Sequence, residues 1–519
     1  MLLCLLFSFL AGCGSKPSDD AMRAGDVFIW GRGADAKGLD PGKEEDGESI
    51  MVIDNINEPL VTYKTDEAVI IPWLATSWEI SDDGLEYTFK LRQGVKFHDG
   101  TPFNADAVVF SIKRQFEGAH YKYWNSMNMA SLIDDVEEID EHTVRFRLKQ
   151  PSGLFLRYCT MHFMYIVSPT AVDKYDRKYG TSVSVPVGTG PYKYKSWRKN
   201  DRIVLERFDD YWNEKARIKY LVFKSIPDNS ARLIALQTGE LHGMNFPDPE
   251  NLPLIEGNKD LRIQSQFSLS IGYLAMNCSR EPFDDARVRR AVNFAIDKEQ
   301  LVATMYPGMG VPAKNPIPPG LNGYNDDIDD YGYDPERAKE LLREAGYPGG
   351  FKTDLWYMPV PRGYMPNGKK IAEIIQSDLR EVGIRAKLDT QDWATYLEYT
   401  SQGKHSMCLL GWGADIADSD NFLNVLLSMD LESGERCEQN VALYENPTLQ
   451  RMLNEARRIS DEERRTEIYR KACEIVHDDA PWFPIAHTKY IAVLRSDVED
   501  VEITLLNKIY FNKVHFKEQ

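Results

Sequence analysis

The chain has 519 residues, of which 43% are hydrophobic and 27% charged, the composition of an ordinary soluble globular protein. This length exceeds what one hydrophobic core usually holds, so we expect two or three lobes. The 62 Lys and Arg against 80 Asp and Glu give a net charge of −18, which argues against nucleic acid as a partner because phosphate-backbone binding needs clustered positive charge.

The N-terminus has the pattern of an export signal. Residues 2–10 form an apolar run that is too short for a permanent membrane span, which takes about 20 residues. The ending Leu10-Ala11-Gly12-Cys13, followed by polar GSKPSDD, resembles the lipobox of bacterial lipoproteins. The resemblance implies a signal peptide over residues 1–12, lipid on Cys13 and a polar tether over residues 13–25. A buried apolar strand with a chance cysteine is the alternative.

No other stretch is long and apolar enough to span a bilayer. We therefore expect an extracytoplasmic body that is held at a membrane by its N-terminal lipid.

The remaining cysteines say little about function. Cys4 would leave with the signal peptide and Cys13 would carry lipid, which leaves five and hence at least one unpaired thiol in a single chain. Cys408 lies in an apolar run and Cys473 in a helical pattern, so we expect both to be buried as small hydrophobic residues.

Strand and helix patterns alternate along the chain, which favours an α/β fold. Period-two patterns predict strands, and apolar stripes with capping residues predict helices, such as the one that starts at Asp334-Pro335-Glu336 and ends at Gly346. The predicted strands cover residues 87–91, 144–148, 203–205, 384–388 and 407–410, and the predicted helices cover residues 285–305, 334–345 and 367–382.

Motifs for catalysis, nucleotides and metals are missing. The chain has no Gly-x-Ser-x-Gly elbow and no His-Glu-x-x-His, and the glycines of residues 187–191 lack the Lys-Ser/Thr that completes a phosphate loop. Residues 325–332 do not place glycine where an EF-hand needs it. We predict no enzymatic activity, no metal site and no cofactor.

Six stretches in order resemble family 5 extracellular solute-binding proteins, the peptide-binding proteins of ABC importers. The longest is PWLATSWEISDDGLEYTFKLRQGVKFHDGTPFNADAVVFSIKR, residues 72–114. The others are VGTGPYKYKSW from Val187, FDDYW from Phe208, PDNSARLIALQTGELHG from Pro227, PFDDARVRRAVNFAIDKEQLV from Pro282 and YDPERAKELLREAGYPGGF from Tyr333.

The resemblance implies a two-lobed α/β fold of the periplasmic-binding-protein type, in the large type II form with three subdomains and a hinge. Lobe I would comprise residues 26–269 and 483–519, with a family-specific subdomain at about 60–185, and lobe II residues 270–482. The crossings would lie near residues 268–273 and 480–487. The implied protein is a monomer that delivers short peptides, with dipeptides as the expected ligands, to a membrane permease.

The same resemblance implies two charged ligand contacts. Asp415, in the Gly-Trp-x-x-Asp segment, would bind the peptide ammonium, and Arg362, in MPVPRGYMPN, would bind the carboxylate. A dipeptide at ~3.5 Å per residue plus two hydrogen bonds would set these groups roughly 10 to 12 Å apart. An outward-pointing surface charge is the alternative for Arg362. A solvated loop acid or helix cap is the alternative for Asp415 and the expectation for Asp418 and Asp420, and metal binding by the three carboxylates ranks third.

Four weaker candidates complete the predicted site. Trp412 and Tyr364 could line side-chain pockets, although core positions suit them as well. Gly31 and Gly33 match where relatives offer strand edges to the ligand backbone, with plain turn glycines as the alternative.

Two other functions stay open at this level. A relative with the same fold could take an oligosaccharide, haem or a chelated metal. A surface-anchored enzyme would need a nucleophile and a base within hydrogen-bond reach, for which the sequence offers no motif.

Overall fold

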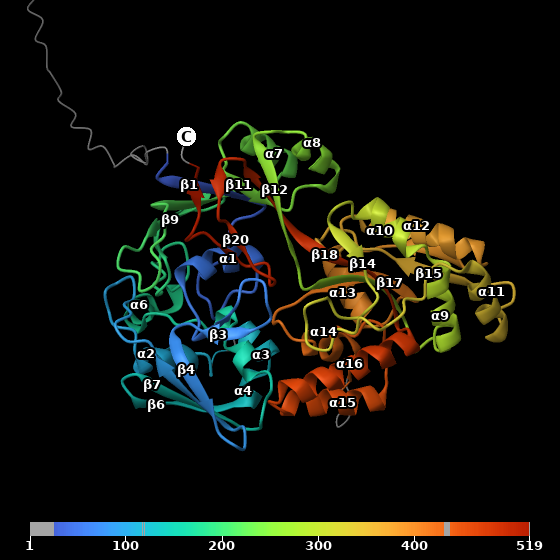
Figure 1. Ribbon diagram of the computed structural model, residues 1–519, viewed down its shortest axis with the longest axis horizontal. Coiled ribbons are helices and arrows are strands. Elements are labelled where there is room, and N and C mark those ends of the chain that lie inside the picture. Colours follow the sequence, from blue (N-terminus) through green and yellow to red (C-terminus); the bar gives the residue numbers. More distant parts are fainter. Residues whose placement is uncertain (1–24, 117, 119, 430–435, 518–519) are drawn as a thin grey trace, which may run out of the picture.

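The computed structural model describes residues 25–116, 118, 120–429 and 436–517, so Cys13 and the predicted signal and tether lie outside the described residues except for Gly25. We use lobe I and lobe II for the residue sets predicted above. The two lobes lie side by side in Figure 1, with the chain's first and last described segments in the same lobe. Within the described residues, no helix combines the length and apolar character that a membrane span requires.

One long mixed sheet runs through both lobes. Its central strand, β18 (Trp482–Arg495), pairs with β13 at one end and with β11 at the other, so a single strand belongs to the sheet of each lobe. The order is β16 (Arg385–Asp389), β15 (Lys352–Trp356), β17 (Met407–Gly413), β13 (Ser270–Met276), β18, β11 (Gly243–Asn245), β1 (Val27–Arg32), β10 (Tyr220–Ser225), β9 (Arg202–Arg207) and β8 (Tyr192–Arg198), with β12 (Leu261–Phe267) and β14 (Gly310–Pro312) also paired to β18.

The two chain crossings between the lobes lie against each other. The Ser268 amide donates to the Thr488 carbonyl over 3.0 Å, and the Ser270 and Thr488 hydroxyls are 2.7 Å apart. These contacts join residues 268–270 to β18 where it passes from one lobe to the other. A hinge at the crossings is consistent with this arrangement and stays a prediction.

A separate antiparallel sheet forms the small subdomain at about residues 60–185. Its strands have the order β4 (Ala75–Ile80), β5 (Glu86–Leu91), β7 (Thr143–Leu148) and β6 (Ile133–Asp140), and its apolar cluster is distinct from that of the long sheet. In Figure 1 the helices α3 and α4 of this subdomain face lobe II. The helices are α2 (Ala105–Lys113), α3 (Lys122–Ser126), α4 (Met129–Leu132), α5 (Phe155–Tyr158) and α6 (Pro169–Tyr175).

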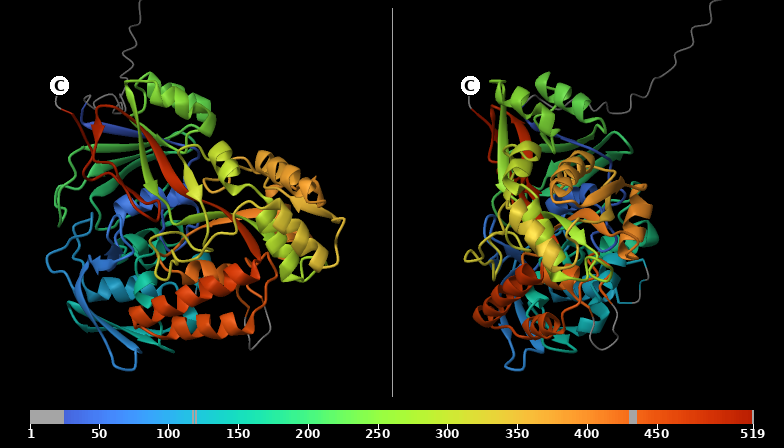
Figure 2. Two further views of the ribbon diagram at one scale, coloured as in Figure 1. Left: turned by 45° about the vertical axis from the view of Figure 1, so that its right-hand side comes forward. Right: turned by 90° about the vertical axis from the view of Figure 1, so that its right-hand side faces the viewer.

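The remaining elements lie outside the two sheets, and Figure 2 shows the molecule from two further sides. Those of lobe I are α1 (Gly47–Ile56), the β2 (Val61–Tyr63) and β3 (Ile70–Pro72) hairpin, α7 (Asn229–Gln237), α8 (Leu252–Glu256) and the C-terminal pairs β19 (Val498–Glu499) with β22 (His515–Phe516) and β20 (Glu502–Ile503) with β21 (Ile509–Tyr510). Those of lobe II are α9 (Ala286–Ala295), α10 (Lys298–Met305), α11 (Pro335–Glu344), α12 (Gly368–Glu381), α13 (Trp393–Ser401), α14 (Asp420–Leu427), α15 (Pro447–Arg458) and α16 (Glu462–Asp479).

Most predicted elements are confirmed, and one is corrected. The strands appear as β5, β7, β9, β16 and β17, and the cap predicted at Asp334 accepts the backbone amide of Arg337. The helix predicted over residues 367–382 is α12, and Asn367 caps it by accepting the Lys370 amide. The helix expected over residues 285–305 is instead two helices. The Asp297 carboxylate accepts the Gln300 amide and so caps α10, which begins as a new helix.

The cysteine predictions hold in the described residues. All five remaining cysteines are free thiols, and Cys408 and Cys473 are fully buried. Burial raises the pKa of both thiols well above the ordinary value, which suits small hydrophobic residues rather than reactive groups.

Candidate functional site

Asp415 lies where lobe II meets lobe I. The chain leaves β17 at Gly413, and the Asp415 amide then donates to Asn421 Oδ1 over 2.9 Å. On the other side the hydroxyl of Tyr123, in α3 of lobe I, donates to Asp415 Oδ1 over 2.6 Å. Tyr123 is 292 positions away in the chain, so no sequence spacing could have indicated it.

Within the described ranges, only neutral groups donate hydrogen bonds to the Asp415 carboxylate. Burial raises its pKa above the ordinary value, against the lowering effect of hydrogen bonds from Tyr123 and Asn421. Among the residues that the structure describes, no cation contributes to this pKa. A largely buried carboxylate without a positive partner is costly, and it favours any cation that can reach it.

The two neighbouring carboxylates are fully buried ion-pair partners, so our expectation of solvated loop acids was wrong. A capping contact is present at Asp418, whose Oδ1 accepts the amide of Asp420, the first residue of α14, over 3.0 Å. Asp418 lies 2.6 Å from Arg157 Nε and 2.9 Å from Arg465 Nη2, and Asp420 lies 3.4 Å from Arg457 Nε. Burial alone would raise the pKa of Asp418, but the two guanidinium groups bring it below its ordinary value. The error arose because these arginines are distant in sequence.

Arg362 lies on an exposed loop between β15 and α12. Its backbone exchanges hydrogen bonds with Met365, at 3.0 and 2.9 Å, and its guanidinium carbon lies 5.1 Å from the centre of the Trp393 ring. A Cβ placed on Gly363 would be 4.0 Å from Phe246 of lobe I, so this loop also reaches the boundary between the lobes. The side chain itself is exposed, and a role in ligand binding stays a prediction.

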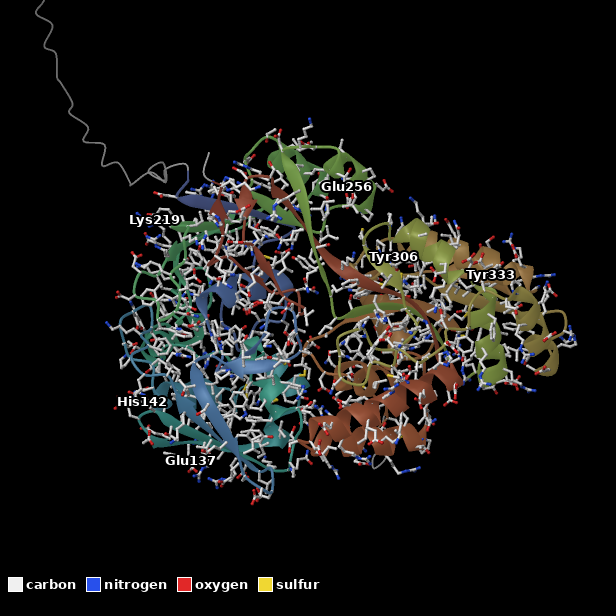
Figure 3. The ribbon with its side chains drawn as sticks, in the orientation of Figure 1. Glu137, His142, Lys219, Glu256, Tyr306 and Tyr333 are labelled. Carbon is white, nitrogen blue, oxygen red and sulfur yellow. The ribbon has the colours of Figure 1, made fainter. Side chains whose placement is uncertain are left out.

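Tyr364 connects the Arg362 loop to the strand that leads to Asp415. A Cβ on Gly411 would lie 2.2 Å from the Tyr364 ring, and one on Gly272 would lie 2.3 Å from the Tyr364 carbonyl oxygen. These two glycines face each other in the β13 and β17 register. The carbonyl of Tyr364 also accepts the hydroxyl of Tyr306, a residue labelled in Figure 3, over 3.1 Å.

Trp412 is held beside this contact. Its indole N–H donates to the same Asn421 Oδ1 that accepts the Asp415 amide, over 3.1 Å, and the side chain is partly buried. Asn421 therefore fixes both residues, a role that no sequence motif indicated.

Gly31 and Gly33 differ in their surroundings. Gly31 lies inside β1, between partners on β10 and β11, and a Cβ there would be 2.4 Å from Leu241. No strand edge is free at Gly31, so close packing replaces the ligand contact that we predicted. Gly33 lies just beyond β1, where its amide is hydrogen-bonded to the partly buried Glu48.

A cavity of about 510 Å³ lies elsewhere in lobe I, at its border with the lobe II loop. Its walls come from the end of α1, the β2 and β3 hairpin, the chain's last segment and Ala417. Neither Asp415 nor Arg362 lines it. The cavity therefore does not belong to the predicted peptide site.

Comparison with known proteins assigns the chain to a family. Residues 69–432 match the family model of bacterial extracellular solute-binding proteins, family 5. The chain belongs to this family. It is a solute-binding protein and not an enzyme, as the sequence predicted.

Three proteins illustrate the similarity of this family 5 protein to known members. The dipeptide-binding protein of Escherichia coli (strain K12) is 38% identical over 473 residues, 88% of each chain, and Heme-binding protein A of Haemophilus influenzae is 39% identical over 457 residues, 85% of this chain and 83% of that one. The structure of the periplasmic binding protein DppA from Helicobacter pylori in complex with peptide STSA superposes with a TM-score of 0.77 at 36% identity, over 95% of this chain and 98% of that one. The predicted α/β periplasmic-binding-protein fold is confirmed.

Gly411→Ala tests the packing of Tyr364 on the glycine pair. The added methyl group would overlap the Tyr364 ring, and we expect a loss of about 1–3 kcal/mol in the free energy of unfolding, measured by urea denaturation. Gly413→Ala is the matched control on the same strand, because a Cβ there meets nothing within 4 Å. Equal losses in the two variants would contradict this account.

Asp418→Asn tests the buried ion pairs. Removing this charge leaves Arg157 and Arg465 partly unpaired, so we expect a loss of about 3–5 kcal/mol in the free energy of unfolding at pH 7. Because folding lowers the pKa of Asp418, its contribution is present above the unfolded pKa of about 3.9 and is lost as the pH falls through the folded value.

The difference between wild type and Asp418→Asn should therefore shrink below about pH 4. Urea denaturation at several pH values measures it, with Glu336→Gln as a control because Glu336 is an exposed partner of Lys339. A difference that is constant down to pH 2.5 would refute the role of the charge.

Proposed function

We propose that this protein is the substrate-binding component of an ABC importer and captures short peptides, dipeptides first, by their charged termini. The carrying observation is Asp415, a largely buried carboxylate at the lobe boundary to which the described part of the chain supplies neutral donors alone. A peptide ammonium is the cation that this position favours. The peptide-binding relatives support the same ligand class.

Arg362 is proposed to bind the peptide carboxylate. Its guanidinium rests on the Trp393 ring, and an exposed contact of this kind is worth about 0.5–1 kcal/mol. A bidentate bond to a carboxylate is stronger, so the side chain can leave Trp393 when a ligand arrives. Tyr364 packs against Gly411, and Trp412 shares the Asn421 side chain with Asp415, so we propose that both form walls for ligand side chains.

A haem-type ligand is the second candidate, because Heme-binding protein A is as similar to this chain as the dipeptide-binding protein is. Haemin lacks an ammonium group, so Asp415 would contribute nothing to its binding. Including haemin among the tested ligands separates the two functions.

Calorimetry with Gly-Leu, Ala-Ala and Ala-Ala-Ala tests the peptide proposal. We expect Asp415→Ala to weaken dipeptide binding by at least about 30-fold, since losing one member of a buried charge pair costs 2–5 kcal/mol. Arg362→Ala should weaken it by about tenfold, because this side chain is exposed. Acetylating the peptide N-terminus should reproduce the Asp415→Ala effect in the wild type.

Arg380→Ala, an exposed charge on α12, is the control and should bind as the wild type does. Binding of haemin with no binding of any peptide would reject the peptide proposal. Binding of acetylated and free dipeptides with equal affinity would reject the role of Asp415.

The proposed location is the outer side of a membrane, with lipid on Cys13. Cys13→Ser should move the protein from the membrane fraction to the soluble fraction after cell lysis, measured by immunoblot. Cys437→Ser, which changes a partly exposed free thiol in lobe II, should stay in the membrane fraction. Retention of the Cys13→Ser protein at the membrane would exclude this anchor.

A further inference from the structure

The segment from Asp415 to Asp418 makes contacts with lobe I that the ligand role of Asp415 does not explain. Ile416 is 2% exposed and packs in the apolar cluster of the small subdomain of lobe I, although the chain on either side of it belongs to lobe II. Asp418 lies 2.6 Å from Arg157, a residue of α5 in the same subdomain. We call residues 415–418 the latch segment.

Arg157 ties the latch segment to a second point of lobe II. Its Nη1 and Nη2 atoms donate to the two carboxylate oxygens of Glu462, at 3.1 and 2.8 Å, while its Nε lies against Asp418. One guanidinium thus contacts the latch segment and the start of α16. Such a fork holds two carboxylates in a fixed relative position, which an ammonium group cannot do.

The backbone continues this contact between the lobes. The Gly153 amide, just before α5, donates to the Arg457 carbonyl at the end of α15 over 2.9 Å. A Cβ on Gly153 would lie 2.2 Å from the Ile459 carbonyl oxygen, so only glycine fits at this approach. Residues 153–157 therefore lie directly on lobe II.

All of these contacts would break together if the lobes moved apart at the crossings. The same segment carries the proposed ligand group Asp415, whose partner Tyr123 also comes from lobe I. Contacts that exist only when the lobes are together shift the equilibrium toward that state. The apparent affinity for a ligand that binds this state is proportional to the fraction of protein in it.

We propose that Arg157 is a positioning residue for ligand binding: it holds the latch segment between the lobes, sets Asp415 in place and raises the affinity for every ligand by the same factor without touching any of them. This inference rests on the proposed function for its affinity readout, and it has a second readout that needs no ligand.

Arg157→Gln in the full chain removes the charge and the fork. We expect the Gly153 amide to exchange with deuterium at least tenfold faster, measured by mass spectrometry of the peptide that contains it, while amides within α16 keep their protection. The dissociation constants of Gly-Leu, Ala-Ala and Ala-Ala-Ala should all rise at least tenfold by one common factor, so that their ranking stays unchanged.

Arg147→Gln is the matched control. Arg147 belongs to the same subdomain, but it pairs with Glu137, which Figure 3 labels at the lower left, on the far side from lobe II. This variant should match the wild type in exchange and in binding. Arg157→Lys, which restores the charge without the fork, should recover part of the protection at Gly153.

Glu462→Gln tests the same contact in case Arg157→Gln fails to fold. Glu462 is half exposed, so its loss should leave the protein folded and yet raise the exchange at Gly153 in the same direction. Unchanged exchange at Gly153 in both variants would overturn the proposal, as would Arg157→Lys behaving like Arg157→Gln or a change in peptide ranking. If the wild type binds no peptide, the proposed function fails, while the exchange measurement still decides the role of Arg157.

Discussion

A carboxylate that is taken out of water needs a positive charge near it, and the stretch from Asp415 to Asp420 meets this need in two ways. Asp418 and Asp420 receive arginines from the protein's own fold, at 2.6 to 3.4 Å. Asp415, only three residues before Asp418, receives a tyrosine hydroxyl and no cation from the described residues. The fold thus gives two of the carboxylates a cationic partner, while the third has none among the described residues, which is the basis of the ligand role proposed for it.

The position of this stretch explains why the different pairing of its carboxylates matters. It follows the strand β17 at the middle of the lobe II sheet, and it is the part of lobe II that enters the small subdomain of lobe I. The Asp415 carboxylate, which has no cationic partner among the described residues, therefore lies where the two lobes meet. Strand β18 belongs to the sheets of both lobes and connects them, which is consistent with the predicted hinge at the crossings.

Predictions from sequence succeeded where the interaction is local. The cap at Asp334, the strands of the small subdomain and the burial of Cys408 depend on neighbouring residues, which the sequence displays directly. The single helix expected over residues 285–305 failed because Asp297 restarts the helix, a local signal that competed with a continuous apolar pattern. Gly31 failed differently, since Leu241 comes from a distant loop.

The sequence by itself determined the family, the α/β class, the acidic surface and the residue types at the candidate site, because these depend on composition, periodicity and motif order. Only the tertiary structure decided which charges are paired, since Arg157 and Tyr123 are more than 250 positions from their partners Asp418 and Asp415. A one-dimensional pattern carries no information on such contacts, whose energies depend on burial and on atomic distances that exist only after folding.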